Sequence, residues 1–331
     1  MTVFFGERDR FEGRFLAERV IDDLDDSGMR GAILMRGVEG FGGKHRLRTD
    51  RLLTLSEDLP IVAIGVGEPG PAAAAGSRIG ALPFAGLVTV EEIGLNAPEI
   101  DETTRGWSKL AVYVGRGRRV DGGTAHEWLI DRLSGAGADG AVALLGVDGI
   151  LGGARRRAGF FARNADVPAL VLAVGDTRAL AAVADELRSR LSDVLVTWER
   201  THVCKRDGGE LRPPGPVHPA GDPGRRRLTL YASEQDRGAG GPLHVEAVRR
   251  LREAGAAGAT ALRGIHGFDG GREPHGDTLW SLRRRVPTLT TVVDEPSRCD
   301  RWLEILDELT PERGTIVSEE IAAAGRDRAP T

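Results

Sequence analysis

The sequence predicts an α+β protein built from three copies of one ferredoxin-like unit. Around each copy the hydrophobic pattern indicates the order strand–helix–strand–strand–helix–strand, which is the order of a ferredoxin-like (βαββαβ) unit. The copies are visible because five glycines recur in register 109 and 227 residues later. The three sets are Gly28, Gly31, Gly37, Gly40 and Gly43; Gly137, Gly140, Gly146, Gly149 and Gly152; and Gly255, Gly258, Gly264, Gly267 and Gly270. A repeat of about 110 residues is the size of a small domain, and is too long for a solenoid unit.

The repeats divide the chain of 331 residues into three units and two linkers. We assign 1–95 to repeat 1, 107–203 to repeat 2 and 225–323 to repeat 3, with linkers at 96–106 and 204–224. The second linker is rich in proline and glycine, which is typical of a spacer. A four-stranded antiparallel sheet with helices on one face leaves its other face and its edges to be covered. We therefore expect the three sheets to pack against each other about a pseudo-threefold axis.

The first half of each repeat shows one helix between two strands. Repeat 1 opens with the strand Val3–Phe5. The helix that follows has an apolar residue every fourth position in all three repeats: Leu16, Val20 and Leu24; Ala125, Leu129 and Leu133; Leu243, Ala247 and Leu251. Gly28, Gly137 and Gly255 then stand where a glycine favours the end of a helix. The second strands are expected at Ala32–Met35, Ala141–Leu145 and Ala259–Leu262.

The second half of each repeat begins with a glycine-rich loop and a strand after a proline. A proline is tolerated at the first residue of a strand, and the three prolines are Pro60, Pro168 and Pro287. The next helix is expected to start at Thr177 as N-cap in repeat 2 and at Ser297, with Asp300 in a capping box, in repeat 3. In repeat 1 the helical pattern of Ala72–Leu82 is weak because it contains two glycines. The last strands are Leu87–Glu92, Val194–Glu199 and Thr315–Glu320. The tryptophans Trp128, Trp198, Trp280 and Trp302 are expected in the cores or the seams between units.

Composition excludes several classes of protein. The net charge of −4 argues against a nucleic-acid binder. Arginine runs at 155–157, 225–227 and 283–285 are interpreted first as solvated faces and second as anion sites. The two cysteines have no metal-type or redox-type neighbours, which favours free thiols in a reducing compartment. No apolar run reaches the ~18 residues of a membrane helix, and the start of the chain lacks a signal-peptide pattern. We expect a soluble, cytoplasmic protein without membrane insertion.

Repeat 1 resembles the bacterial domain-of-unknown-function 190 family. The resemblance is carried by Gly6-Glu7-x-Asp9, Gly28-x-x-Gly31, the run from Arg36 to Gly42, and Ser56-Glu57-Asp58-Leu59-Pro60. Repeat 3 keeps Arg263-Gly264-Ile265-His266-Gly267-Phe268, with His266 in place of Glu39, whereas repeat 2 has Leu145 for the arginine and Ile150 for the phenylalanine. Members of this family are similar in fold to the PII signal-transduction proteins, whose ferredoxin-like units form homotrimers. The resemblance implies a trimer fused into one monomeric chain, in which repeats 1 and 3 line the working clefts and repeat 2 is degenerate.

What the resemblance implies about function is a regulator, not an enzyme. PII-type proteins bind small effectors, often adenine nucleotides, in the clefts between units. A mobile loop between the second and third strands then meets a target protein. The expected partners are therefore a small anionic effector, with a nucleotide among the candidates, and a protein target, with a membrane transporter or a fluoride channel among the candidates. No cofactor is expected.

The candidate ligand-binding residues lie in the loops of repeats 1 and 3. Glycines there free the backbone for close approach to an anion, which Arg36 and Arg263 would pair with. Phe41 could stack on a base or fill the seam between units. The alternative is an ordinary loop whose Arg-Gly turn is structural. The candidates are Arg36, Gly37, Glu39, Gly40, Phe41, Lys44, His45, Arg263, Gly264, His266 and Phe268.

Other site types lack their residues. A phosphate-binding loop around Lys44 would need glycine at Val38 and serine or threonine at His45. The histidines show no metal spacing, although His266 and His275 share one loop and leave a metal site there as a minor alternative. No Ser-His-Asp or Cys-His set can be assembled, so no catalytic residue is proposed.

Two other functions stay open. One is a scaffold without ligand, which a closed cleft filled by Phe41 and Phe268 would favour. The other is a small enzyme acting on a phosphorylated or carboxylated metabolite, which a carboxylate within reach of His45, His266 or His275 would favour.

Overall fold

The computed structural model describes residues 1–43, 45–50, 58–96, 106–158, 165–209, 211–213, 224–238, 240–270, 272–276 and 286–323. Three sequence-based predictions therefore lie outside the described residues: those for Lys44, for Trp280 and for the arginine run 283–285.

Each repeat has the predicted order of strands and helices. Repeat 1 contains β1 (Thr2–Gly6), α1 (Leu16–Asp26), β4 (Gly31–Arg36), β7 (Pro60–Val66), α2 (Pro69–Gly80) and β8 (Leu87–Val90). Repeat 2 contains β9 (Trp107–Gly115), α3 (Ala125–Gly135), β12 (Gly140–Leu145), β15 (Pro168–Asp176), α4 (Thr177–Arg190) and β16 (Leu195–Lys205). Repeat 3 contains β17 (Arg225–Ser233), α5 (Leu243–Glu253), β20 (Ala259–Arg263), β23 (Pro287–Asp294), α6 (Pro296–Leu309) and β24 (Thr315–Ala323).

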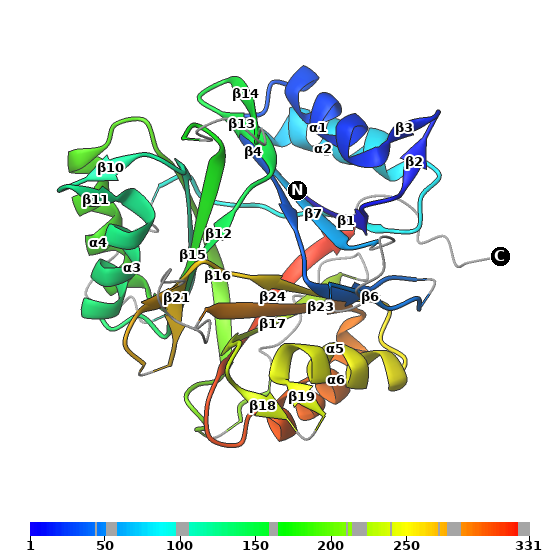
Figure 1. Cartoon of the computed structure of the whole chain (residues 1–331), viewed down its shortest axis with the longest axis vertical. Coiled ribbons are helices and arrows are strands. Elements are labelled where there is room, and N and C mark those ends of the chain that lie inside the picture. The colour runs from blue at the N-terminus through cyan, green and yellow to red at the C-terminus, as the bar shows by residue number, and fades with distance from the viewer. Residues whose placement is uncertain are drawn as a thin grey trace.

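The four strands of each repeat form an antiparallel sheet with the first strand in the middle. In repeat 1, for example, β1 pairs with both β7 and β8, and β7 pairs with β4. Figure 1 shows the helix pairs on the outside and the sheets facing the centre of the molecule. The prediction of three ferredoxin-like units about a pseudo-threefold axis is confirmed.

Short hairpins precede the first helix of each repeat. They are β2 (Arg10–Phe11) with β3 (Arg14–Phe15), β10 (Arg119–Val120) with β11 (Gly123–Thr124), and β18 (Arg237–Gly238) with β19 (Gly241–Pro242). Gly28, Gly137 and Gly255 end the helices with φ of 66°, 76° and 88°, a backbone conformation that favours glycine. The predicted role of these three glycines is therefore confirmed.

Two predicted helix caps are wrong by one or two residues. The N-cap of α4 is Asp176, whose carboxylate accepts from the backbone N–H groups of Arg178 and Ala179, so Thr177 is already helical. The N-cap of α6 is Glu295 and makes no side-chain cap, because Pro296 opens the helix with its backbone angle fixed and without an N–H to satisfy. Ser297 therefore lies inside the helix and not at its cap.

A short strand after the second strand of each repeat crosses to the neighbouring repeat. β5 (Glu39–Phe41) of repeat 1 pairs with β20 of repeat 3, β13 (Asp148–Leu151) of repeat 2 with β4 of repeat 1, and β21 (His266–Asp269) of repeat 3 with β12 of repeat 2. Each carries one apolar side chain into the neighbour's core: Phe41 enters the core of repeat 3, Ile150 that of repeat 1 and Phe268 that of repeat 2. We call these three segments the exchanged strands.

The exchanged strands return through further short hairpins. β13 pairs with β14 (Ala154–Arg157), β5 with β6 (Arg48–Thr49), and β21 with β22 (His275–Gly276).

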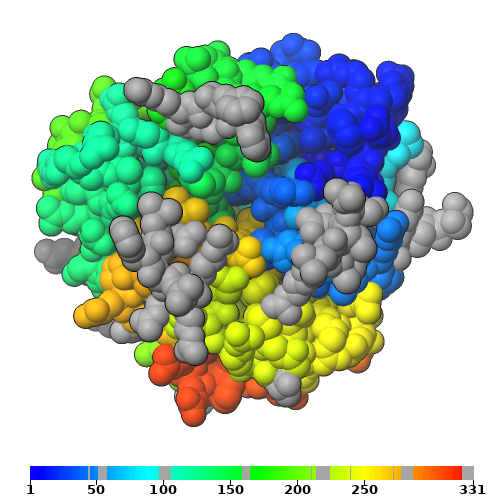
Figure 2. Space-filling view, in the orientation of Figure 1, coloured from blue at the N-terminus to red at the C-terminus, as the bar shows by residue number. Residues whose placement is uncertain are grey.

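The opposite edge of each sheet is closed in the same cyclic manner. The last strand of each repeat runs on beside the last strand of the next. Gly94 pairs with Trp198, His202 with Ser318, and Ala322 with Val90. Both sheet edges are thereby covered, which removes the exposed edges expected of an isolated unit. Figure 2 shows the resulting compact assembly, with repeat 1 in blue, repeat 2 in green tones and repeat 3 in yellow to orange.

Buried charges from all three repeats meet at the pseudo-threefold axis. Glu91, Glu199 and Glu319 occupy the same position of the three last strands, and we call them the axial glutamates. Lys109 lies 2.6 Å from Glu199 and 2.8 Å from Glu319. Arg227 lies 2.9 Å from Glu91, 3.0 Å from Glu199 and 2.5 Å from Glu319.

The axial glutamates differ in their affinity for protons. Burial raises the pKa of Glu199 to about 7 in spite of Lys109 beside it. Burial would also raise the pKa of Glu91, but Arg227 and Lys109 lower it to about 2. The ion pairs join the repeats electrostatically as the exchanged strands join them by packing.

The interpretation of the arginine run 225–227 as a solvated face is wrong. Arg226 and Arg227 are buried, because β17 is a central strand between β23 and β24. The run at 155–157 is half-exposed, and Arg155 and Arg157 form ion pairs with α1 of repeat 1. Trp198 and Trp302 are buried in the cores as expected, and Trp128 packs against the core of repeat 2.

None of the helices in the described ranges has the length and apolar character needed to cross a membrane.

Candidate functional site

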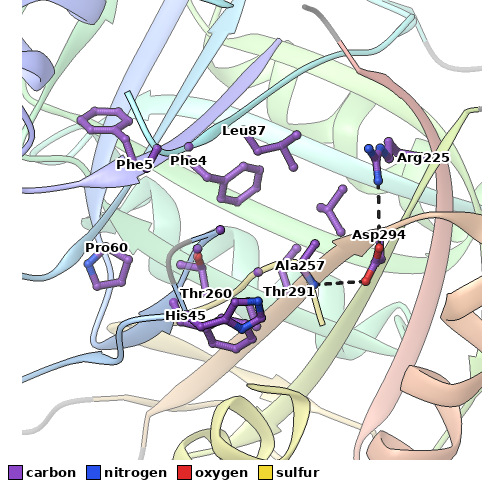
Figure 3. A pocket seen from close by; sticks show the side chains of 18 of the residues that line it. Phe4, Phe5, His45, Pro60, Leu87, Arg225, Ala257, Thr260, Thr291 and Asp294 are labelled. Atoms are coloured by element: carbon purple, nitrogen blue, oxygen red, sulfur yellow. Dashed lines mark hydrogen bonds and ion pairs between the residues drawn. The ribbon is translucent and has the colours of Figure 1, made fainter. Parts of the chain in front are cut away.

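A cleft of about 470 Å³ lies where β5 of repeat 1 rests on β20 of repeat 3. We call it the open cleft. Repeat 1 lines it from β1, the exchanged strand and the start of β8, and repeat 3 lines it from the loop after α5 and the start of α6. Figure 3 shows Phe4 and Leu87 above the cleft, His45 and Ala257 below it, and Arg225 and Asp294 at its right-hand end. The volume is within the ~300–1,000 Å³ range of small-molecule sites.

One wall of the open cleft is aromatic. The rings of Phe41 and His45 are stacked, with centroids 5.8 Å apart and an interplanar angle of 22°. Phe41 is buried, whereas His45 is exposed and closes a tight turn by donating its backbone N–H to Gly42 at 2.7 Å. His45 has a φ of 49°, so the turn places its ring over Phe41 through a left-handed backbone conformation. A flat ligand could stack on the exposed face of this pair.

The opposite wall is organised by Asp294, which is buried at the end of β23. Its carboxylate accepts from Nε1 of Trp302 at 2.9 Å and from the backbone N–H of Ala257 at 3.2 Å. Arg298 lies 3.3 Å and Arg225 4.0 Å from the same carboxylate. Asp294 therefore fixes the loop after α5 and holds two guanidinium groups at the cleft.

A third arginine lies on the repeat 1 side. Arg48 is held by Asp58 at 3.0 Å and by Asp9 at 3.8 Å. The charged residues that line the open cleft are three arginines, Arg48, Arg225 and Arg298, and two acidic residues, Asp294 and Glu295. The charged lining therefore has a small positive excess, which favours an anionic ligand.

Three equivalent residues explain why the seams differ. The third position of the Gly-x-x-Gly segment is Arg30 in repeat 1, Asp139 in repeat 2 and Ala257 in repeat 3. Arg30 is paired with Glu68 at the seam where β13 rests on β4. Ala257 has the smallest of the three side chains and leaves the open cleft unobstructed.

The seam where β21 rests on β12 is filled, and we call it the closed cleft. Asp139 accepts from Nε1 of Trp107 at 2.8 Å and pairs with Arg206 at 2.9 Å. The next residue, Asp207, donates its backbone N–H to the carbonyl of Gly314 at 3.1 Å. The turn after β16 thus occupies the space that stays empty in the open cleft.

The structure brings two of the predicted site residues, Phe41 and His45, into the open cleft. Arg36 lies outside its lining and forms an ion pair with Glu7 at 2.8 Å. Arg263 lies between Asp50 at 3.1 Å and Glu234 at 2.8 Å. Pairing of Arg36 and Arg263 with an effector therefore stays a prediction, and it would require these ion pairs to open.

The predicted glycines serve the exchanged strands. A Cβ atom on Gly40 would lie 2.8 Å from the carbonyl oxygen of Ala259, and one on Gly37 would lie 2.9 Å from that of Ala261. A Cβ atom on Gly264 would collide with Val142 of repeat 2. These glycines are required because the backbones of neighbouring repeats approach closely there. Glu39 is buried in the same exchanged strand, paired in register with Ala261.

The remaining predicted residues lie at the seam with repeat 2. Phe268 is buried in the core of repeat 2, and His266 pairs in register with Ala143 of β12. Burial lowers the pKa of His266. Among the described residues no three His, Cys, Asp or Glu side chains are grouped closely enough to hold a metal ion.

Asp294 and Arg298 on the repeat 3 wall of the open cleft were not predicted from the sequence, and Arg225 was predicted only as part of an arginine run with an anion site as its second interpretation. A comparison of the three Gly-x-x-Gly segments could have indicated this wall, because Ala257 stands where the other two repeats have charged residues.

Comparison with known proteins now places the chain in a family. The model of domain of unknown function 190 (DUF190), described as "Uncharacterized ACR", matches three times, at residues 1–95, 107–203 and 225–323. The chain therefore belongs to this family, with three fused copies of its domain. It is similar to a protein of Aquifex aeolicus (strain VF5) described as "UPF0166 protein", with 30% identity over 80 residues that cover 24% of this chain and 76% of the relative.

Proposed function

We propose that this chain is a PII-like regulatory protein that binds a small anionic effector in the open cleft. The observation that carries the proposal is the cleft itself: about 470 Å³ between repeats 1 and 3, with a stacked aromatic pair on one wall and arginines on the other. The lining suits a ligand with a flat part and an anionic part, and an adenine nucleotide is one candidate. The proposal assigns no catalytic step.

When the effector binds, the chain would act on a partner protein in the cytoplasm. The exchanged strand that carries Phe41 also carries the turn around His45, so a ligand against these rings would contact the start of the long loop of repeat 1. A conformational change passed along this loop would present a different surface to a target. A membrane transporter or a fluoride channel is the target that the family resemblance implies.

A thermal-shift screen of the full chain tests the proposal. We would use ATP, ADP, AMP, cyclic nucleotides, small carboxylates and fluoride. A ligand at about a hundred times its dissociation constant stabilises the native state by about 2.7 kcal/mol. The proposal predicts a clear shift with at least one anion, and a panel without any shift would contradict it.

A matched pair of variants locates the binding. Ala257→Asp places the residue of repeat 2 in the open cleft and should abolish the shift, because it narrows the cleft and adds a negative charge. Ala74→Asp adds the same charge on the exposed face of α2, outside the cleft lining, and should leave the shift unchanged. An equal shift in both variants would mean that the effector binds elsewhere.

One observation favours a scaffold role at the seam between repeats 2 and 3. There Phe268 fills the core of repeat 2 and Asp139, Trp107 and Arg206 fill the closed cleft. At that seam the contacts of these side chains join the repeats.

A further inference from the structure

The closed cleft is occupied by a segment of the chain itself. β16 runs past its own sheet and pairs with β24, and the turn that follows, 206–209, enters the cleft. Arg206 reaches Asp139 there. A Cβ atom added to Gly270 would lie 3.1 Å from the Cβ atom of Asp207, so the turn lies directly against the exchanged strand of repeat 3.

β24 is the strand that leads toward the open cleft, and it extends along the neighbouring repeat as β16 does. β24 runs past its own sheet and pairs with β8, with Ala322 opposite Val90. Val90 and Ser318 are equivalent because each directly precedes the axial glutamate of its strand. Ala322, opposite Val90, is therefore equivalent to His202, which pairs with Ser318.

An arginine and an aspartate follow both strands at equivalent positions. Arg206 and Asp207 follow His202 by four and five residues, and Arg326 and Asp327 follow Ala322 by four and five residues. β16 has a one-residue bulge between Val203 and Lys205. With the same bulge, a continued pairing of β24 along β8 would bring Arg326 and Asp327 to the open cleft as Arg206 and Asp207 are brought to the closed one.

The open cleft has the counterparts of the groups that receive the Arg206 turn. These equivalent pairs are Asp139 and Ala257, Gly314 and Gly86, and Gly270 and Gly43. All three counterparts line the open cleft, so its free volume includes the place that the turn fills in the closed cleft.

The charged side chains that line the open cleft are suited to pair with Arg326 and Asp327. On the repeat 3 wall, the carboxylate of Glu295 could pair with an arginine. On the repeat 1 wall, His45 and Arg48 could pair with an aspartate. In the closed cleft Arg272 is at the position of His45. It pairs with Asp236 at 2.6 Å and with Asp269 at 3.3 Å, and Asp207 adds a weaker electrostatic attraction. The position of Arg272 therefore holds a basic residue, His45, in the open cleft.

We propose that the segment after β24 docks in the open cleft, with Arg326 and Asp327 at the positions that Arg206 and Asp207 hold in the closed cleft. The chain would then carry its own competitor for the open cleft. The competition, though not the docking, rests on the function proposed above.

Cysteine trapping in the full chain tests the docking. By equivalence with Gly270 and Asp207, the Cβ atoms of Gly43→Cys and Asp327→Cys should come close to the ~3.5–4.5 Å that a disulfide requires. The matched control pairs Gly43→Cys with Arg328→Cys, because a Cβ atom on Gly208, the residue equivalent to Arg328, would face the backbone of Glu312 and not Gly270. The native Cys204 and Cys299 are buried and serve as internal references.

We expect the Gly43–Asp327 pair to form its disulfide at least about tenfold faster than the control pair, because docking raises the effective concentration of one thiol at the other. Equal rates, or no disulfide in either variant, would overturn the docking.

A second variant separates docking from competition. Arg326→Ala with Asp327→Ala should increase the affinity for any nucleotide or carboxylate that shifts the wild-type melting temperature. If the disulfide forms but no ligand changes the melting temperature, the docking is supported and the effector proposal is rejected. Unchanged affinity in the double alanine variant would reject the competition.

Discussion

Phe268 offers the sharpest test of the exchanged-strand architecture. By sequence it belongs to repeat 3, but its side chain is 2% exposed within the core of repeat 2. Truncation of a fully buried phenylalanine to alanine costs about 3–5 kcal/mol. This is a large part of the ~5–15 kcal/mol by which native proteins are stable, so Phe268→Ala should lower the free energy of unfolding of the whole chain severely.

Urea unfolding followed by tryptophan fluorescence and circular dichroism measures this loss. The matched control is Phe15→Ala, because Phe15 is 42% exposed and its ring contacts Arg10 at the surface. We expect the control to stay within about 1 kcal/mol of the wild type. If Phe268→Ala also stayed within that limit, the exchanged strand would not hold repeat 2 together.

Three further predictions follow from single side chains. Since the pKa of Glu199 is raised from 4.5 to about 7 in the folded state, its favourable contribution is complete below pH 4.5 and is lost as the pH rises to about 7. Glu199→Gln should therefore flatten the fall in unfolding free energy over that range, and an unchanged pH profile would contradict the assignment. Asp139→Ala removes the acceptor of Trp107 and should change its fluorescence and cost about 1–3 kcal/mol in urea unfolding, whereas a neutral effect would show that the closed cleft is not held by this residue. Ala257→Asp should change the free energy of unfolding by no more than about 0.5 kcal/mol, because Ala257 is exposed. A larger loss would make this variant unsuitable for testing the binding site.

The fold was predictable because its main signals are local. The helix stripes, the prolines before the third strands and the glycines after the first helices each depend on a few neighbouring residues. The exchanged strands were not predictable in this way. Glu39–Phe41 is three residues long and contains a glycine, and its hydrogen-bonding partner lies more than two hundred residues away in β20.

The candidate site was predictable in part for the same reason. Phe41 and His45 were found because they lie in a distinctive loop. Arg225–Arg227 looked solvated because three adjacent charges are unusual in a buried strand. Arg227 is buried at low cost only because Glu91, Glu199 and Glu319 come from three different repeats to meet it. Such partners cannot be read from the sequence near the arginines.

Hydrogen–deuterium exchange of the full chain tests the central claim most directly. The compound with the largest thermal shift would be added, and protection would be followed by mass spectrometry of peptides. Binding in the open cleft predicts new protection at residues 41–43 and 255–260, with none at the equivalent residues 268–270 and 137–142 of the closed cleft. Protection confined to the closed cleft, or to peptides away from both clefts, would contradict the assignment of the effector site.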